Sequence, residues 1–460
     1  MRFFKYHLRG VFALLFIPLV CGAQLQPADI FTDNMVLQRN HPIHVWGKGQ
    51  PGDEVKVSLG DDTVVGIIGG DSTWSVQLTK RDATRNPLSM TISSGDSRIK
   101  LKNILVGDLW LCIGQSNMEW PMSNEMHFQE ALPESNQPLL RFYNPTYASK
   151  GIYARPFHDT TLQRMDVANF FVESSWQVSD EETVPRMSAV GYYFGKNVVE
   201  VTHVPVGLIH LAVGGAPIES FIEPDVLAND KRFSNKVMGD WLTNPHLPVF
   251  ARQRGYENVG DGRAIHGDSL GPNHAYKPGF AYLAGVAKVT SLPIAGILWY
   301  QGESNAQEKE RVDEYVELMK LMVDDYRGKW DHLDLPFYYV QLSSIDTVKY
   351  RAQLWPEFRN EQRLALDQIA HSGMAVSSDH GARNNVHPRN KKAVGERLAR
   401  WALHDHYGMR VIPSGPLPVS AHYKRGKVIV RFKYVGKGLK TAGKGPVIGF
   451  SLDGHTEVPV

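Results

Sequence analysis

Five nearly continuous runs of apolar residues constrain the fold of this chain most strongly. A strand buried on both faces, as in a parallel sheet, carries such a run, whereas a half-buried strand alternates apolar and polar residues. Apolar residues at helical spacing lie between or after these runs, over 314–330 and 391–407. This alternation predicts an α/β fold with a doubly wound parallel sheet over 105–410. The runs are ILVGDLWLCIG (104–114), VPVGLIHLAVGG (204–215), PIAGILWYQG (293–302), PFYYVQLSS (336–344) and MAVSSD (374–379).

The segments on either side of this region have the pattern of β structure. Over 24–104, short alternating runs are separated by Pro-Gly, Asp-Asp and Gly-Gly-Asp turns, which predicts an N-terminal β-sandwich-like domain. The last segment, 411–460, is expected to be a C-terminal β segment because it contains KVIVRFKYV (427–435) and PVIGFSLDG (446–454). Residues from about 225 to 280 have no clear period and predict an elaborate loop over one face.

Residues 1–23 have the layout of a secretory signal peptide. Arg2, Lys5 and Arg9 form a basic head, an apolar run covers 11–20, and we expect cleavage before Gln24. The apolar run is too short to cross a bilayer, and no later stretch is apolar enough to do so. We therefore expect an exported protein without a membrane span, in the periplasm or outside the cell; the alternative for this segment is a buried strand or helix.

Charge and cysteine content argue against several classes of protein. The formal net charge of +2 creates no bulk field toward nucleic acid or a membrane surface, so neither is an expected partner. Of the two cysteines, Cys21 lies in the predicted signal and Cys112 in the run LWLCIG, so we expect a small buried thiol and no disulfide framework. The chain has no HExxH or paired-cysteine spacing and no Gly-rich phosphate loop, so we expect neither a metal nor a cofactor.

Polar clusters follow four of the five apolar runs. Residues 114–117 (GQSN) follow the first run, Gly214-Gly215 the second, and 301–305 (QGESN) the third. Ser378-Asp379 follows the fifth run, and His387 comes shortly after it. Ligands of an open α/β sheet bind just outside the carboxyl ends of its strands. All four clusters are expected at that edge, which predicts an active site there.

Ser116 and His387 are the candidates for nucleophile and general base. Ser116 lies at a strand-to-helix turn, where backbone N–H groups favour developing negative charge. Serine needs an adjacent base, and a neutral imidazole can take its proton and return it to the leaving alcohol. His387 is fixed by Pro388 just before a predicted helix. The alternative for Ser116 is an N-cap serine.

An esterase also needs donors for the oxyanion of its tetrahedral intermediate. The N–H groups of Ser116 and Gly215 could supply them, together with a side-chain amide from Gln301 or Asn305. Gln115 and Glu303, in the same clusters, are candidates for supporting roles. The alternative for Gly214-Gly215 is a tight turn without a catalytic part.

An ordered set of motifs makes the chain resemble the sialate O-acetylesterases, a branch of the SGNH hydrolases. The resemblance covers most of the chain and implies a split α/β hydrolase core that cleaves acetyl esters of sugars without a metal, with Ser116 and His387 at the family's catalytic positions. The motifs are FTDNMVLQRNHPIHVWGKGQPGDEVKV (31–57), VGDLWLCIGQSNMEWPM (106–122), MSAVGYYFGK (187–196), VPVGLIHLAVGGAPIESF (204–221), GILWYQGESNA (296–306), LPFYYVQL (335–342) and VHPRNKKAVGERLA (386–399).

The sequence departs from the family pattern in two places. SGNH enzymes often carry an Asp three residues before the histidine, where this chain has Asn384. Asp379 is then the nearest candidate for the orienting acid, and a backbone carbonyl that leaves a Ser–His dyad is the alternative. The chain also stops at Val460, where relatives usually continue, so the C-terminal β segment is expected to be incomplete.

The expected substrate is an acetylated carbohydrate, with O-acetylated sialic acid first and acetylxylan or another glycan as alternatives. Four aromatic residues near the clusters could line a sugar cleft or belong to the core, and Arg383 and Arg389 flank His387. A lipase-like or thioesterase activity, and a glycan-binding protein without catalysis, are the competing hypotheses. The sequence does not indicate an oligomeric state. The four aromatic residues are Trp120, Tyr192, Trp299 and Tyr300.

Overall fold

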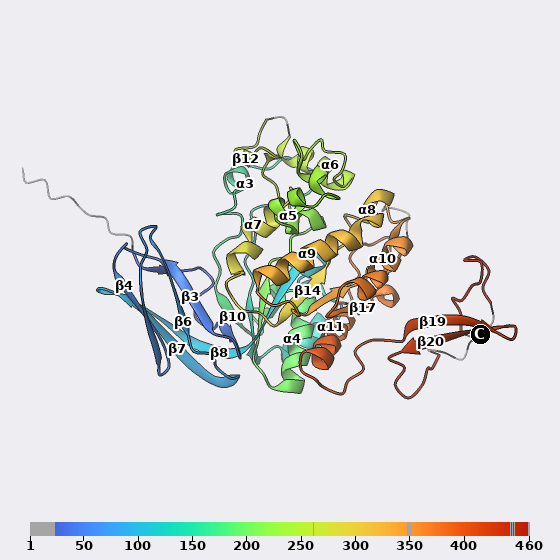
Figure 1. The fold of residues 1–460 in the computed structure, drawn as a ribbon, viewed down its shortest axis with the longest axis horizontal. Helices are drawn as coiled ribbons and strands as arrows, with labels where there is room; N and C mark the ends of the chain where they lie inside the picture. The colour runs from blue at the N-terminus through green and yellow to red at the C-terminus, as the bar shows by residue number, and fades with distance from the viewer. Residues whose placement is uncertain are drawn as a thin grey trace, which may run out of the picture.

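The computed structural model describes residues 24–260, 262–346, 351–441, 443, 445 and 447–458. The predicted signal peptide, 1–23, lies outside these residues. Figure 1 shows three parts in chain order: a β-rich part, an α/β body and a projecting β-hairpin. In the part of the chain that the structure describes, no helix is long and apolar enough to span a membrane.

Seven strands form the central sheet of the body, in the order β10-β9-β11-β8-β14-β15-β17. The pairs from β9 to β17 are parallel, and β10 is an antiparallel edge strand. The predicted parallel sheet is therefore present, and its order brings the predicted clusters to neighbouring strands. The strands are β8 (Ser97–Gly114), β9 (Gln137–Tyr143), β10 (Trp176–Ser179), β11 (Val206–His210), β14 (Gly296–Tyr300), β15 (Phe337–Val340) and β17 (Ser372–Ala375).

Helices cover both faces of this sheet, which explains the nearly continuous apolar runs. On one face, Trp110 of β8 packs edge-on against Phe194 of α4 (Ala189–Thr202), with ring centroids 5.0 Å apart. Tyr338 of β15 contacts Trp401 of α11 (Lys392–Asp405) on that face. On the other face, the Trp299 indole donates to the hydroxyl of Tyr315, the first residue of α9 (Tyr315–Lys329). Figure 1 shows α9 on one side of the sheet and α4 and α11 on the other.

Strand β8 runs through both the N-terminal β structure and the central sheet. Its first residues, 97–103, are mostly exposed or half-buried, whereas every residue from 104 to 114 is buried. The change of sequence pattern near residue 104 therefore marks a change of burial inside one strand. One sheet of the N-terminal part consists of β1 (Gln26–Pro27), β3 (Ile43–Lys48) and β6 (Thr73–Leu78). In the other sheet, β8 pairs with β2 (Val36–Gln38) and with β7 (Thr84–Ser94). Strand β7 also pairs with β4 (Glu54–Leu59), which pairs with β5 (Asp62–Ile67).

The segment 225–280 contains short elements in place of the single long loop that was expected. It includes most of α5 (Pro224–Asn229), then α6 (Val249–Val259) and a small pair of strands, β12 (Gly267–Asp268) and β13 (Gly271–Pro272). Their lengths are too short for a clear sequence period. The segment reaches the predicted site, because the hydroxyl of Tyr276 donates to the carbonyl of Gly214 at 2.8 Å.

The C-terminal hairpin projects from the α/β body (Figure 1). It consists of β19 (Leu417–Lys424) and β20 (Lys427–Lys433), and most of its residues are exposed. The strand predicted over 446–454 is not formed in the described residues 447–458, where an isolated bridge joins Ser451 and Glu457. An apolar pattern forms a strand only where a partner strand satisfies its backbone groups, and this segment has no ladder partner among the described residues.

Candidate active site

The predicted nucleophile follows the sharp end of the central strand β8. Gly114 has a φ of +129°, and a Cβ there would lie 2.2 Å from the carbonyl oxygen of Tyr300 at the end of β14. Only glycine allows this close approach of two backbones. The N–H of Gln115 donates to that same carbonyl at 2.9 Å. Ser116 then begins the short helix α1 (Ser116–Glu119), at the carboxyl edge of the sheet.

Ser116 and His387 meet at this edge, as the sequence predicts. The Ser116 Oγ lies 2.7 Å from Nε2 of His387, although the two residues are 271 positions apart. The imidazole stacks on Trp120, with ring centroids 5.2 Å apart and 24° between the planes. Asn385 Oδ1 accepts from the backbone N–H of His387, which fixes the turn that carries the ring. Both residues are partly exposed, so a substrate can reach the pair.

The electrostatic surroundings keep His387 in its neutral form. Burial, together with the positive charge of nearby Lys391, lowers the pKa of His387 to about 4. A neutral imidazole has a free lone pair on Nε2 at neutral pH, which is the form that can accept a proton from serine.

A buried lysine joins the serine turn to the histidine loop, and sequence reasoning missed it. Lys391 is fully buried, and its ammonium donates to Oδ1 of Asn117. The Nδ2 of Asn117 donates to the carbonyl of Val386 at 3.0 Å and also to Oε1 of Glu303. Asn117 follows Ser116 and Val386 precedes His387, so these contacts tie together the neighbours of the pair. The position of Lys391, four residues after His387 and next to the start of α11, was the available signal.

Charge in this buried set is shared between one lysine and two carboxylates. Burial lowers the pKa of Lys391 to about 7, against the opposing effect of Glu303 and Glu125. Burial raises the pKa of Glu303, whose Oε2 has no hydrogen-bond partner among the described residues. Glu303, predicted as a supporting residue, thus contacts Asn117 rather than the catalytic pair.

Gln115, Gln301 and Asn305 form a buried amide network behind the site. Oε1 of Gln115 accepts from Nε2 of Gln301 at 3.1 Å, and Nε2 of Gln301 also donates to Oδ1 of Asn305 at 2.8 Å. Nδ2 of Asn305 donates to Oε2 of Glu219 at 3.0 Å. The side-chain amides of Gln301 and Asn305, which were predicted as oxyanion donors, therefore donate to hydrogen bonds inside the protein. Gln115, the other predicted supporting residue, joins the nucleophile turn to this network.

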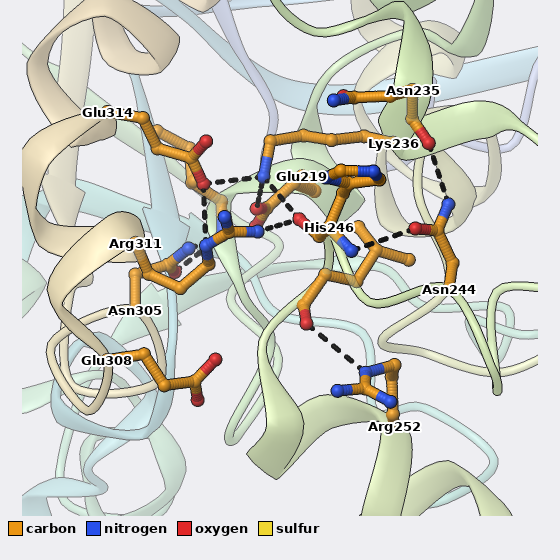
Figure 2. Close-up of polar contacts among 12 residues, drawn as sticks. Glu219, Asn235, Lys236, Asn244, His246, Arg252, Asn305, Glu308, Arg311 and Glu314 are labelled. Atoms are coloured by element: carbon orange, nitrogen blue, oxygen red, sulfur yellow. Dashed lines mark hydrogen bonds and ion pairs between the residues drawn. The ribbon is translucent and has the colours of Figure 1, made fainter.

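The network continues into a buried ion cluster, which Figure 2 shows around Lys236. The ammonium of Lys236 lies 2.8 Å from Glu219 and 2.6 Å from Glu314. Lys236 belongs to the short helical turn Ser234–Val237, and Glu314 lies immediately before α9. The cluster thus fastens the 225–280 segment to the helical layer behind Asn305.

The backbone donors predicted for the oxyanion remain available. In the described part of the chain, the N–H groups of Ser116 and Gly215 donate to no hydrogen bond. Gly215 has a φ of +76°, and a Cβ there would lie 2.1 Å from the hydroxyl oxygen of Tyr276. The neighbouring Gly214 donates through its N–H to the hydroxyl of Tyr147 at 3.0 Å. The two tyrosines hold the glycine turn, so it is a rigid feature of the site.

The structure does not bring Asp379 into contact with His387. Both carboxylate oxygens of Asp379 accept from the guanidinium of Arg397 at 2.6 Å. The hydrogen bond from Arg397 lowers the pKa of this carboxyl. Asn384 has a φ of +51°, and among the described residues its buried Oδ1 has no partner. No carboxylate of the described residues hydrogen-bonds to His387, so the pair has the arrangement of a dyad.

The other side chains singled out in the sequence divide between core and surface. Of the four aromatic candidates, Trp120 lies at the site, and the others are fully buried. Arg383 is largely exposed and pairs with Asp346, whereas Arg389 donates to the carbonyl of Asn124. The three buried aromatic residues are Tyr192, Trp299 and Tyr300.

Known proteins resemble this chain over most of its length. A family model described as carbohydrate esterase, sialic acid-specific acetylesterase matches residues 272–404. A mouse sialate O-acetylesterase is 25% identical over 430 residues, which cover 84% of this chain and 75% of the relative. The human sialate O-acetylesterase is 24% identical over 465 residues, 92% of this chain and 80% of the relative.

A solved structure resembles the fold as well. The crystal structure of a carbohydrate acetylesterase from Xanthomonas citri superposes with a TM-score of 0.74 and 25% sequence identity. The match covers 94% of this chain and 88% of that one, and so includes the β-rich part as well as the α/β body.

Proposed function

The chain belongs to the sialic acid-specific acetylesterase family of carbohydrate esterases, and from that premise we propose that it hydrolyses O-acetyl esters of sugars through a Ser116–His387 dyad. The single observation that carries the mechanism is the 2.7 Å contact between Ser116 Oγ and His387 Nε2 at the carboxyl edge of the sheet. A hydroxyl and a neutral imidazole in this geometry form an activated nucleophile.

Acylation begins when Ser116 Oγ attacks the carbonyl carbon of the acetyl ester and its proton passes to His387 Nε2. The carbonyl electron pair moves to the oxygen, and a tetrahedral oxyanion forms. Collapse of this intermediate breaks the bond to the sugar oxygen, which takes the proton from Nε2 and leaves as an alcohol. Water then attacks the acetyl-serine with the same base, so acetate leaves and Ser116 recovers its proton.

The oxyanion is proposed to bind to the N–H groups of Ser116 and Gly215. These donors are fixed before the reaction, because α1 starts at Ser116 and the tyrosine hydroxyls hold the turn at Gly214. Donors that need no reorganisation stabilise the transition state most, by roughly 3 kcal/mol each. The side-chain amides of Gln301 and Asn305 support the turn instead of binding the oxyanion in this proposal.

Among the residues that the structure describes, no carboxylate orients the imidazole of the proposed dyad, so other contacts must do so. Stacking on Trp120 fixes the plane of the ring, and the Asn385 turn fixes its backbone. The low pKa of His387 supports a base that is neutral across the physiological range. A dyad stabilises the imidazolium less than a triad does, and rigid placement of the ring compensates for part of that loss.

The proposed preferred substrate is O-acetylated sialic acid, because the mouse and human relatives are named sialate O-acetylesterases. The basic head and apolar run of residues 1–23 support export, which would bring the enzyme to acetylated glycans outside the cytoplasm.

The test is acetate release from O-acetylated sialic acid, acetylated xylan and p-nitrophenyl acetate, with Ser116→Ala measured alongside. We expect release from at least one sugar ester and its loss in the variant, and the ranking of the two sugars assigns the substrate. Failure of the folded wild-type protein to release acetate from all three would contradict the proposal and favour glycan binding without catalysis.

A further inference from the structure

A large cleft separates the β1-β3-β6 sheet from the α/β body, away from Ser116. Its volume is about 910 Å³, within the usual range for sites that bind small molecules. Residues of the β-rich part form one wall, and residues near the edge strands β9 and β10 and near α7 (Phe280–Ala284) form the other. We call this space the intersheet cleft.

Aromatic side chains line the intersheet cleft from both sides. Trp46 and Trp74 come from the β-rich part, and Tyr143 and Phe171 come from the body. Trp46 is half-buried, and Phe31 supports it edge-on at a centroid distance of 4.8 Å. Its indole N–H has no hydrogen-bond partner among the described residues, which leaves a donor for a ligand. An amphipathic ring with an unused N–H suits a partner with both C–H and hydroxyl groups.

The charged groups of the cleft balance, because two carboxylates, Asp29 and Glu173, share the lining with two lysines, Lys48 and Lys288. Asp29 and Glu173 are exposed at the lining, and neither carboxylate has a hydrogen-bond partner within the described part of the chain. Of the two lysines of the lining, Lys288 lies near Asp29. Burial, with the charges of Asp29 and Glu173, raises the pKa of Tyr143 to about 12, so its hydroxyl remains a donor. A lining of balanced charge favours neither an anionic nor a cationic ligand, and the two unpaired carboxylates can accept hydrogen bonds from neutral hydroxyls.

Two side chains connect the cleft wall to the catalytic turn. Phe171 lines the cleft and contacts Tyr147 edge-on, with ring centroids 6.2 Å apart. The hydroxyl of Tyr147 accepts from Gly214, the neighbour of the proposed oxyanion donor. These contacts connect the wall of the intersheet cleft to the catalytic turn through the protein interior.

We propose that the intersheet cleft binds neutral sugar residues of the glycan whose acetyl ester is cleaved at Ser116. The inference rests on the proposed function for the identity of the glycan, but binding does not require turnover. Clefts between domains or layers, with aromatic walls and a few polar groups, are typical sites for small molecules.

The experiment is calorimetric titration of the full-length Ser116→Ala protein with neutral hexasaccharides of xylose, of glucose and of N-acetylglucosamine. None of the three carries an O-acetyl ester, so recognition of the scissile group does not contribute. We expect at least one to bind, and Trp46→Ala to weaken that binding at least tenfold. Glu173→Gln should weaken it severalfold without removing any packing, and so tests the cleft if Trp46→Ala fails to fold.

The matched control is Tyr423→Ala, an exposed aromatic residue on the C-terminal hairpin, which should leave binding unchanged. In the wild-type background, Trp46→Ala should leave hydrolysis of p-nitrophenyl acetate unchanged, because that ester has no distal sugar. Absence of binding by all three hexasaccharides overturns the inference, as does binding that Trp120→Ala removes while both cleft variants retain it. A protein that binds through Trp46 but releases no acetate would contradict the proposed function and leave the cleft assignment intact.

Discussion

The buried ammonium of Lys391 donates to Oδ1 of Asn117, the residue that follows Ser116. Asn117 in turn donates to the carbonyl that precedes His387. One lysine thereby holds the two loops that must meet for proton transfer, although it contacts neither reacting atom. A charged side chain that is buried usually has a specific structural or functional role.

Substitution of Lys391 by Met should slow catalysis more than it weakens substrate binding. Without the ammonium, Oδ1 of Asn117 loses its donor, and the loops carrying Ser116 and His387 are free to separate. Small displacements of reacting groups cost about a hundredfold in rate, so we expect kcat to fall by about ten- to a hundredfold while KM changes little. Steady-state kinetics with p-nitrophenyl acetate check this.

Lys392→Met is the matched control, because Lys392 is the next residue along the chain and is only partly buried. It should keep kcat within about twofold of wild type, by the usual small effect of surface substitutions. Equal kinetic losses in both variants would contradict the role assigned to Lys391.

The acidic limb of kcat/KM should lie near pH 4 instead of near pH 6.5. His387 acts as a base only when neutral, and its pKa in the folded protein is lowered to about 4. A lowered pKa keeps the imidazole neutral at lower pH, so activity should persist through pH 5 and fall as the pH approaches 4. Rates measured from about three pH units below the ordinary histidine pKa of about 6.5 to about one and a half units above it, with folding monitored at each pH, test this.

The same profile tests the effect of Lys391 on His387. Removal of the positive charge in Lys391→Met should move the limb upward, toward the ordinary histidine value of about 6.5. A wild-type limb already at that value, and unmoved in the variant, would show that His387 is not held neutral by its surroundings.

Asp379→Asn should leave the rate within a few-fold of wild type. The Asp379 carboxylate is occupied by Arg397, so the change removes a partly exposed ion pair and no contact to His387. Neutralising a true triad acid costs about four orders of magnitude. Acetate release by this variant, with His387→Ala as the inactive reference, shows whether Asp379 is a triad acid or only the ion-pair partner of Arg397. A loss of a thousandfold or more would restore Asp379 as the orienting acid.

Gly215→Ala should lower kcat by about a hundredfold, the usual cost of one lost oxyanion donor. A Cβ at this position would lie 2.1 Å from the Tyr276 hydroxyl, so the turn must shift and carry its N–H away. Gly151→Ala is the control: its φ is +75°, but a Cβ there meets nothing within 4 Å. The control carries similar backbone strain and should keep full activity. Similar losses in the two variants would refute the oxyanion role of Gly215.

Much of the site could be predicted because its residues follow strand ends. The nearly continuous apolar runs predict parallel strands, and parallel strands bring their carboxyl ends to one edge. Ser116 and His387 therefore meet as predicted, despite the 271 positions between them. Local pattern and topology were sufficient for this pair.

The sequence pattern could not predict roles that depend on contacts between distant parts of the chain. Lys391 reads as a surface lysine at the start of a helix, and only the fold shows that it is buried. Asp379 was expected to contact His387, but its carboxylate accepts hydrogen bonds from Arg397, in the middle of α11. Gln301 and Asn305 follow a strand end as predicted, yet their amides bond to each other. Sequence position identifies the edge where a side chain lies, whereas its hydrogen-bond partner depends on neighbouring elements.

Covalent labelling of Ser116 is the sharpest test of whether this serine is the nucleophile. The protein is treated with an alkyl fluorophosphonate, which forms a stable adduct with an activated serine, and the labelled peptide is identified by mass spectrometry alongside acetate release. We predict one adduct, on Ser116, that appears in step with the loss of acetate release. It should be absent from Ser116→Ala, whose own turnover should be lower by at least about a thousandfold. An adduct on another residue, or a Ser116→Ala protein that still releases acetate at the wild-type rate, would contradict it.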